Sequence, residues 1–187
     1  METGAESDLR ELVVLVDESG RELGTATKLS VHVSGRLHRA VSVFVFDGEG
    51  RALLQRRAAG KYHSGSLWSN TCCGHPRPGE PPVAAAYRRL REEIGVRCPL
   101  APAFSFVYHT ALENGLIEHE HDEVFVGRFD GTPVPCPQEV EDWSWVTADE
   151  LIEDVAVHPS RYSAWFPIAL RELLARGVPE QDLRWAV

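Results

Sequence analysis

The stretch GHPRPGEPPVAAAYRRLREEIGV, residues 74–96, joins a loop rich in Gly and Pro to the clearest helix pattern in the chain. Gly and Pro argue against regular structure in CCGHPRPGE, residues 72–80. Beyond it, apolar side chains recur at spacings of four, three and four, which places them on one helical face: Val83, Tyr87, Leu90 and Ile94. Pro82 suits a first helical turn, and Gly95 stands where a C-terminal cap belongs. The pattern predicts a helix over 81–95.

The polar side of this helix mixes acids with bases. Glu92 and Glu93 lie one helical turn from Arg88 and Arg89, so carboxylates and guanidinium groups share a solvent edge. An isolated REEIG segment could equally be a solvated helix face. Its position after CCGHP instead favours a site for Mg²⁺, which prefers carboxylate and phosphate oxygens.

Strand patterns precede and follow the helix. Val41, Val43 and Val45 alternate with apolar or small residues, which predicts a strand covered on both faces. Thr147 and Glu150 form a capping-box pattern that opens a short helix. We expect further strands over 12–16, 52–56, 67–71, 104–112, 116–129 and 143–146, and a last helix over 164–176. This order predicts an α+β fold, a mixed β-sheet with flanking helices. We expect one domain over residues 1–187, with 1–10 and 178–187 as peripheral tails.

Charge and composition limit the partners. The net charge of −9 argues against nucleic acid or an anionic membrane as the partner, because both require a basic surface. No apolar run approaches the roughly 18 residues of a membrane span, and residues 1–10 lack a signal-peptide pattern. We therefore expect a cytoplasmic protein, with Cys72, Cys73, Cys98 and Cys136 reduced.

A pair of acids and three histidines form a candidate metal site. On an extended strand Glu118 and Glu120 share one face, which is costly unless a cation or proton lies between them. An exposed acidic strand face is the plain alternative. His32, His38 and His75 could complete a five-ligand site for Mn²⁺, Mg²⁺ or Zn²⁺. The other histidines are expected to be structural, with His119 facing away from the two acids: His63, His109, His119, His121 and His158.

Several spaced motifs resemble known families. Gly74, Glu80 and the run Arg88 to Val96 resemble the Nudix box, which holds a divalent cation on a diphosphate. Nudix hydrolases place Glu directly after the first Arg of that run, and here the position is Arg89. A guanidinium in place of a carboxylate favours binding a diphosphate over cutting it.

Five motifs in order, from about residue 12 to 175, resemble the type I isopentenyl-diphosphate isomerases. The segment SNTCCGHP resembles that family's NxxCGHP, with Cys73 as catalytic cysteine and His75 as metal ligand. The other four matches are Lys28 and His32 with Arg36-Leu37-His38, Arg57 with Lys61, Glu118-His119-Glu120, and Ser163-Ala164-Trp165.

The resemblance implies interconversion of isopentenyl and dimethylallyl diphosphate through a carbocation. Glu120 would protonate the terminal methylene, helped by Tyr108, and Cys73 would take the C2 proton, or the roles would be reversed. Trp165 would stabilise the cation. Lys28, Arg57, Lys61 and Arg89 would hold the diphosphate, with a Mg²⁺ touching Glu93. The second divalent ion would bind His32, His38, His75, Glu118 and Glu120.

Some alternatives stay open at this point. A two-residue Asn114-Gly115 turn would pair His109 with Glu120, whereas the resemblance places Tyr108 there and implies an odd loop or a bulge. A thiol pKa near 8.5 makes Cys73 a poor base without tuning, and Cys72, Cys98 and Cys136 are expected as small buried residues. Rival functions are a Nudix hydrolase of nucleoside diphosphate-linked substrates and a non-catalytic diphosphate-binding module. We expect a monomer.

Overall fold

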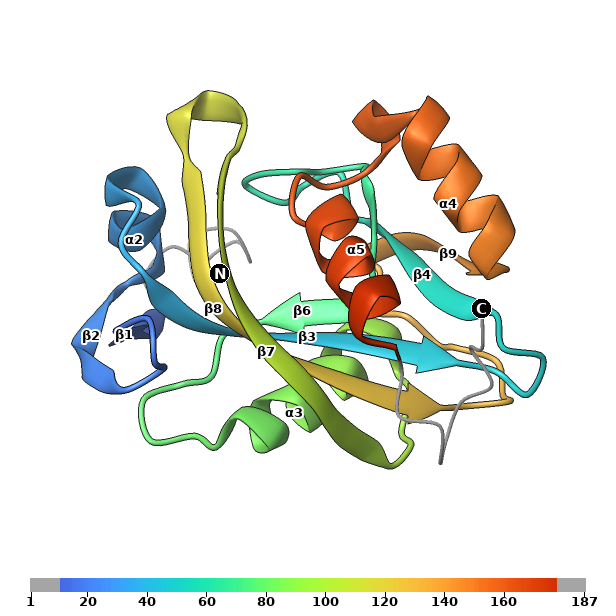
Figure 1. The fold of residues 1–187 in the computed structure, drawn as a ribbon, viewed down its shortest axis with the longest axis horizontal. Coiled ribbons are helices and arrows are strands. Elements are labelled where there is room, and N and C mark those ends of the chain that lie inside the picture. The colour runs from blue at the N-terminus through green and yellow to red at the C-terminus, as the bar shows by residue number, and fades with distance from the viewer. Residues whose placement is uncertain (1–10, 178–187) are drawn as a thin grey trace.

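A computed structural model describes residues 11–177, and the predicted tails 1–10 and 178–187 lie outside the described residues (Figure 1). The predicted α+β class is confirmed, because the strands form one mixed sheet with helices on both of its faces. The strands are β1 Leu12–Val16, β2 Glu22–Thr27, β3 His38–Phe46, β4 Ala52–Arg57, β5 Trp68–Ser69, β6 Cys72–Gly74, β7 Leu100–Ala111, β8 Ile117–Arg128 and β9 Val140–Val146. The helices are α2 Lys28–Ser34, α3 Pro82–Ile94, α4 Ala148–Val157 and α5 Phe166–Arg176, with short 3₁₀ turns at Glu113–Gly115 and Pro159–Arg161.

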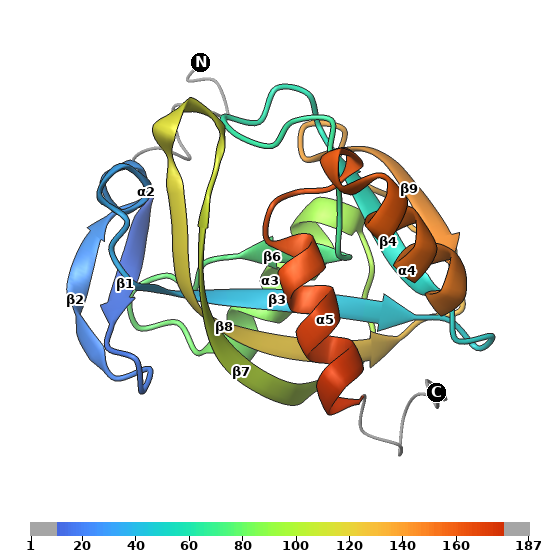
Figure 2. The ribbon, with the colours of Figure 1, turned by 45° about the horizontal axis from the view of Figure 1, so that its top comes forward.

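Strand β3 organises the sheet. It pairs in parallel with β8 from His38↔Glu120 to Phe46↔Arg128, and antiparallel with β6. Its Val41, Val43 and Val45 pack with residues of α3, whereas Phe44 and Phe46 pack with residues of α5. This period of two confirms the predicted strand with both faces covered. Figure 2 shows α5 in front of the sheet and α3 behind it.

Helix α3 begins and ends close to the prediction. Pro82 lies in its first turn, and Gly95 caps it with the left-handed φ of 68° that glycine favours. The buried face is rotated from the expected one, since Val83 and Tyr87 are 40% and 43% exposed. Leu90 and Ile94 are buried as predicted, and Ala86 and Glu93 are buried with them. The rotation carries Glu93 inward, towards the sheet.

One prediction about local structure is wrong, and two elements were not predicted. Residues 72–74, expected to be irregular, form β6 because their backbone pairs with Val41–Val43. The sequence pattern also gave no prediction for β2 or α2. The seven-residue α2 is nevertheless capped at both ends, by Thr27, which accepts from the Ser30 N–H, and by Gly35 in the left-handed region.

The β7–β8 hairpin settles the open register. Tyr108 lies opposite Glu120, and His109 lies opposite His119. The two-residue turn is therefore wrong, because five residues, 112–116, separate the last pair Ala111↔Ile117. The loop holds a 3₁₀ turn in which Asn114 has φ 62°. The hairpin extends past the sheet beside α2 (Figure 1).

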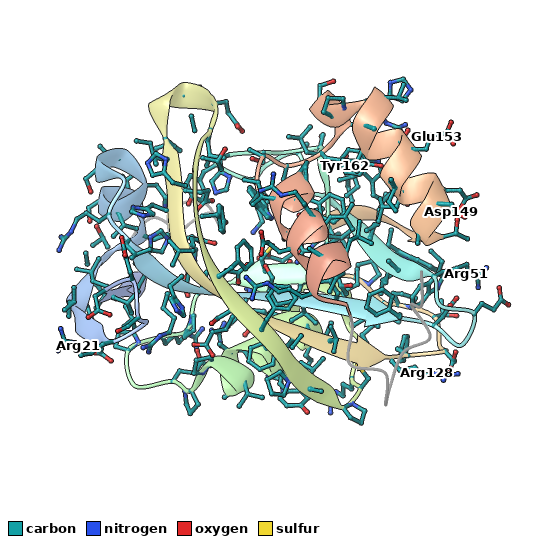
Figure 3. All side chains as sticks on the ribbon, in the orientation of Figure 1. Arg21, Arg51, Arg128, Asp149, Glu153 and Tyr162 are labelled. Atoms are coloured by element: carbon teal, nitrogen blue, oxygen red, sulfur yellow. The ribbon has the colours of Figure 1, made fainter. Side chains whose placement is uncertain are left out.

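The C-terminal helices cover the second face of the sheet. The capping box of α4 is present, with Thr147 and Glu150 each accepting from the other's backbone. Tyr162 lies between α4 and α5 (Figure 3). Its hydroxyl donates to Asp154 at 2.5 Å. Within residues 11–177, no helix combines the length and apolar character that crossing a membrane requires.

Candidate active site and metal centre

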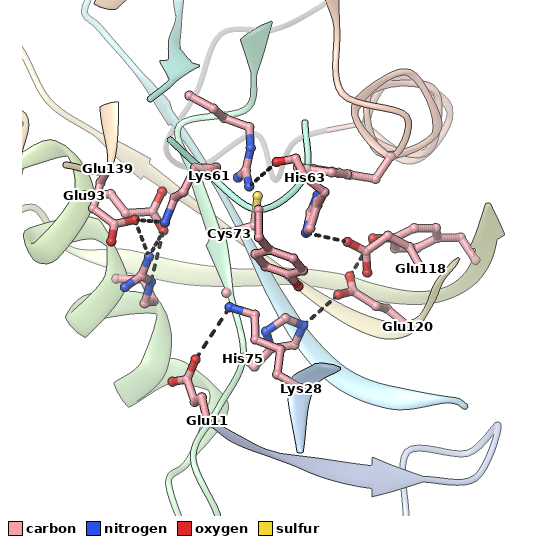
Figure 4. A pocket seen from close by; sticks show the side chains of 16 residues that line it. Glu11, Lys28, Lys61, His63, Cys73, His75, Glu93, Glu118, Glu120 and Glu139 are labelled. Carbon is pink, nitrogen blue, oxygen red and sulfur yellow. Dashed lines mark hydrogen bonds and ion pairs between the residues drawn. The ribbon is translucent and has the colours of Figure 1, made fainter. Parts of the chain in front are cut away.

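The predicted functional side chains come together in one pocket, which encloses about 650 Å³ including its open mouth. Residues from α2, α3, β4, β6, β7, β8, the loop between β4 and β5 and the segment before α5 are among those that line it. Every predicted site residue lines this pocket except His32 and His38, which are fully buried beneath it. Figure 4 shows Cys73 between a cluster with Lys61, Glu93 and Glu139 and a cluster with Glu118 and Glu120. We name the first cluster, with Arg89, the diphosphate end. The metal end comprises His32, His38, His75, Glu118 and Glu120.

Imidazole nitrogens and carboxylate oxygens converge at the metal end. His32 Nε2 lies 3.0 Å from Glu118 Oε2. His75 Nε2 lies 2.9 Å from Glu120 Oε1 and 3.2 Å from His38 Nε2. Ligand atoms of His32, His38, His75 and Glu120 all lie within 4.8 Å of one another. The fold thus gathers into one group side chains from α2, β3, β8 and the segment after β6.

Backbone carbonyls orient two of these rings. His32 Nδ1 lies 2.7 Å from the Lys28 carbonyl oxygen, and His38 Nδ1 lies 2.9 Å from that of Arg36. Each Nδ1–H can donate to its carbonyl, which leaves Nε2 available to ligate a cation in the cluster, as in metal-binding histidines. His75 Nδ1 is buried without a hydrogen-bond partner among residues 11–177. Converging imidazole nitrogens and two carboxylates fit a divalent cation.

Burial and neighbouring charges shift the titration of the metal end. Burial and the charge of Glu120 raise the pKa of Glu118. Although burial opposes it, hydrogen bonds from His38 and His75 hold the pKa of Glu120 well below its usual range. Burial lowers the pKa of His75 to about 3, against its hydrogen bond with Glu120. The His75 ring is therefore neutral, as a metal ligand must be.

The acid pair continues into a third buried carboxyl. Glu118, Glu120 and Asp122 share one face of β8, and each is at most 7% exposed. Ser42 Oγ donates to Asp122 Oδ2 at 2.7 Å. Burial and the charge of Glu120 raise the pKa of Asp122. The sequence analysis missed this residue, although its spacing of two from Glu120 was readable. His119 lies on the opposite face and hydrogen-bonds to the Gly35 carbonyl oxygen, as predicted.

Cys73 and Tyr108 are proton-carrying groups near the middle of the pocket. Tyr108 donates to Glu120 Oε2 at 2.5 Å, and Cys73 Sγ lies 3.5 Å from Asn70 Oδ1. Burial, reinforced by Glu93, raises the pKa of Cys73 to about 12. At rest the thiol therefore keeps its proton while Glu120 is ionised. Cys72 is fully buried, as expected, whereas Cys98 and Cys136 are only partly buried, because both lie on connecting segments outside the helices and strands.

The Trp165 ring packs against two other side chains of the pocket. The Arg57 guanidinium lies 5.0 Å from the centre of its ring, and the His63 ring lies 5.7 Å away in an edge-on arrangement. The indole is 5% exposed. Its face is therefore desolvated, which strengthens its attraction for a cation.

The diphosphate end contains cations already paired with acids. Arg89 Nη2 lies 2.7 Å from Glu93 Oε1 and 3.0 Å from Glu139 Oε2. Lys61 Nζ lies 2.5 Å from the same Glu139 oxygen. A Cβ at position 74 would come within 2.8 Å of Arg89 Cγ, so Gly74 permits this close approach. Glu139 was missed in the sequence, because no motif drew attention to it.

The NUDIX domain family matches residues 36–166. An isopentenyl-diphosphate Delta-isomerase 2 of Aromatoleum aromaticum is 55% identical over 167 residues, covering 89% of this chain and 88% of its own. The isopentenyl-diphosphate Delta-isomerase of Burkholderia multivorans is 51% identical, covering 95% of this chain and 99% of its own. That of Serratia proteamaculans is 46% identical, covering 94% of this chain and 96% of its own. The chain belongs to the isopentenyl-diphosphate isomerase family.

Solved structures of other proteins have a fold similar to that of this chain. The Deinococcus radiodurans protein DR0079 superposes with a TM-score of 0.73 at 21% identity, covering 87% of this chain and 98% of that one. A MutT NUDIX hydrolase of Burkholderia pseudomallei gives 0.58 at 22% identity, covering 74% and 98%. At such identities the likeness shows the Nudix fold alone. The resemblance stated from the five sequence motifs is confirmed at the level of the family.

Proposed function

We propose that this chain interconverts isopentenyl and dimethylallyl diphosphate by adding a proton to one carbon of the allylic unit and removing one from another. The observation that carries the proposal is a single pocket with a cationic end, a candidate metal end, and Cys73 together with the hydrogen-bonded Tyr108–Glu120 pair. The names of relatives 46–55% identical to this chain support it.

Binding starts from the charges at the two ends. Arg57, Lys61, Arg89 and Lys28 line the pocket and supply cations for the diphosphate. Glu93 lies beside Arg89 and would hold a Mg²⁺ that accompanies the diphosphate. The metal end would hold a second divalent ion, Mn²⁺, Mg²⁺ or Zn²⁺, which would fix Glu120 and sharpen its electrostatic setting.

Proton transfer is assigned to Cys73 and to the Tyr108–Glu120 pair. An alkene is a weak base, so its protonation needs a positioned acid in a site without water. The resting site holds a protonated Cys73 and an ionised Glu120, a state in which the thiol donates and the carboxylate accepts. The sequence analysis gave protonation of the terminal methylene to Glu120 and allowed the reverse. Both orders stay open, and Tyr108 donates a hydrogen bond to Glu120 in the structure.

The cation between the two proton transfers needs stabilisation without a nucleophile. The Trp165 ring is buried and already has the Arg57 guanidinium over it. An indole face attracts a tertiary carbocation and does not attack it. We further infer that the protein acts in the cytoplasm as a monomer on a free isoprenyl diphosphate.

The hydrolase alternative is less well supported. Arg89 occupies the position where hydrolases of the Nudix family carry Glu, and its guanidinium pairs with Glu92, Glu93 and Glu139. That arrangement neutralises the carboxylates that would activate water.

Turnover followed by NMR in D₂O tests the proposal. Isopentenyl diphosphate incubated with metal-loaded protein should gain deuterium at the methyl derived from the terminal methylene, and later at C2, with no release of phosphate. An unaltered spectrum, or growth of inorganic phosphate, would overturn the proposal.

Cys73→Ala decides the order of proton transfer. If Cys73 donates first, the variant should show neither isomerisation nor exchange at the terminal methylene, and its metal content should be unchanged. Exchange that persists at the terminal methylene would assign the first protonation to Glu120.

A further inference from the structure

His63 lies beside the metal end, although the sequence analysis treated it as a structural residue. Its Nε2 is 3.6 Å from Glu118 Oε1, on the side of Glu118 that faces the loop between β4 and β5 (Figure 4). Ligand atoms of His63, His32 and Glu118 all lie within 4.8 Å of one another. A second group of potential metal ligands therefore adjoins the first and shares His32 with it.

The ring of His63 is set up as the rings of His32 and His38 are. Its Nδ1 lies 3.2 Å from Ser64 Oγ, which can accept the Nδ1 proton and leave the Nε2 lone pair facing Glu118. The side chain is 6% exposed. The Nε2 lone pair of His63 and the carboxylate oxygen of Glu118 are both acceptors. A hydrogen or a cation between them is therefore required to make the contact favourable.

Hydrogen bonds hold the backbone of the loop at His63 and at Ser64. The Ser64 backbone N–H donates to Glu113 Oε1 in the hairpin turn, and Ser64 has the positive φ of 52°. Arg57 Nη2 donates to the His63 carbonyl oxygen at 3.4 Å. The ring is therefore held in place by the fold and does not depend on a flexible loop tip.

We propose that His63 is a further ligand of the divalent ion at the metal end, bound from the Glu118 side. The inference rests on the proposed function of that end as a metal site. The two ligand groups share His32, whose Nδ1 is held by the Lys28 carbonyl and whose Nε2 lies 3.0 Å from Glu118 Oε2, so an ion bound to that Nε2 would adjoin both groups. The site then offers four imidazoles and two carboxylates.

A fourth imidazole changes which metals the site prefers. Imidazole nitrogen favours Zn²⁺, Co²⁺ and Ni²⁺, whereas Mg²⁺ prefers oxygen ligands. Removal of His63 should therefore weaken Zn²⁺ and Co²⁺ binding while leaving Mg²⁺ binding nearly unchanged. A loss of site integrity would weaken all of these ions together.

The test compares metal-free wild-type protein with His63→Ala and His63→Gln, and with His158→Ala as a control on an exposed histidine. Zn²⁺ affinity is measured by competition with a chelator, Mg²⁺ affinity by calorimetry, and Co²⁺ coordination by its visible spectrum. We expect Zn²⁺ affinity to fall at least about tenfold in both His63 variants, with an altered Co²⁺ spectrum and Mg²⁺ affinity within about twofold. Unchanged Zn²⁺ affinity and an unchanged Co²⁺ spectrum would show that His63 only supports the Trp165 ring.

A measurement on the wild-type protein removes any dependence on how the variants fold. Side-chain ¹⁵N NMR of the histidines should show four rings, His63 among them, moving to metal-bound shifts on addition of Zn²⁺. Three rings would overturn the proposal. The D₂O assay separates this inference from the proposed function, because a protein that binds Zn²⁺ through four rings without isomerising its substrate contradicts only the latter.

Discussion

At the metal end, buried carboxylates of Glu118 and Glu120 face imidazole nitrogens, whereas at the diphosphate end Glu93 and Glu139 face Arg89 and Lys61. The metal end brings carboxylate oxygens and imidazole nitrogens together, and none of its five residues is a permanent cation. The diphosphate end contains permanent cations, which its own acids neutralise. The metal end thus needs an ion to be satisfied, while the diphosphate end can exchange one set of ion pairs for another when an anion arrives.

This difference predicts what each end does when a partner is removed. A buried carboxylate that loses its cation must take up a proton or rearrange. An internally paired guanidinium retains some of its partners.

Removing an imidazole should have the largest effect. His75→Ala deletes a ligand that lies beside both Glu120 and His38, so metal affinity should fall by more than about a hundredfold, since loss of even an outer partner typically costs about 10–100-fold. Glu118→Gln should also lose metal. Metal analysis of the purified proteins, with His109→Ala as an exposed control, checks this. Unchanged metal content in both variants would break the distinction between the two ends.

Reversing a charge at the diphosphate end should have an intermediate effect. Arg89→Glu replaces attraction with repulsion, and loss of one charge-assisted contact typically costs about 1.5–3 kcal/mol, roughly ten- to a hundredfold in affinity. Calorimetric titration with an inert diphosphate analogue measures it, while metal content at the other end should not change.

Two further variants control that experiment. Arg89→Met removes the attraction without adding a carboxylate beside Glu93 and Glu139, and should show a smaller loss. Arg91→Glu makes the same charge reversal on the exposed face of α3 and should bind the analogue as wild type does. Equal affinities in all of these proteins would exclude Arg89 from diphosphate binding.

Trp165 sharpens the comparison because its ring packs against both Arg57 and His63. Trp165→Phe keeps a π-face and should retain partial activity, whereas Trp165→Leu should lose about tenfold more, in line with about 1–2 kcal/mol for a desolvated cation–π contact. Isomerisation rates at saturating substrate decide this. Equal rates in the two variants would mean that Trp165 only fills space.

The smallest expected effect is a difference between the two ends in how the free energy of unfolding depends on pH. His75 and His63 have folded-state pKa values of about 3 and about 2, below the ordinary value of 6.5, so the unfolded chain binds more protons at mildly acidic pH. Their contribution to stability is present at neutral pH and is lost as the pH falls below 6.5. His32, whose pKa is raised, offsets part of this loss. The lowered pKa of Glu139 gives a contribution present above 4.5 and lost as the pH falls through its folded value.

Denaturant unfolding of the metal-free protein between pH 7 and 5 tests this separation. His63→Gln should flatten the dependence of the free energy of unfolding on pH, by up to about 1.4 kcal/mol per pH unit. Glu139→Gln should leave the slope in this window as it is in wild type. Identical slopes for His63→Gln and wild type would contradict a neutral, buried His63.

Local chemistry in the sequence was enough to predict much of the molecule. The period of two in β3, the helix ended by Gly95 and the capping box of Thr147 all appear, because these signals depend on neighbours within a few residues. The acid pair of Glu118 and Glu120 was also readable, since alternate residues of a strand share a face. The five motifs pointed to the family and to a set of side chains that the structure brings into one pocket or directly beneath it.

Tertiary structure alone decided which of these side chains meet. Pairing with β3 turned Cys72–Gly74 into a strand, and a five-residue loop set Tyr108 opposite Glu120. His63, Asp122 and Glu139 became part of the site through packing between segments up to about 80 residues apart in the chain, as the Lys61–Glu139 pair shows. Such contacts leave no local pattern, because each residue type is also common on a solvated surface. The sequence by itself therefore determined the elements and the chemistry available, and long-range pairing determined the protonation states and the ligand geometry.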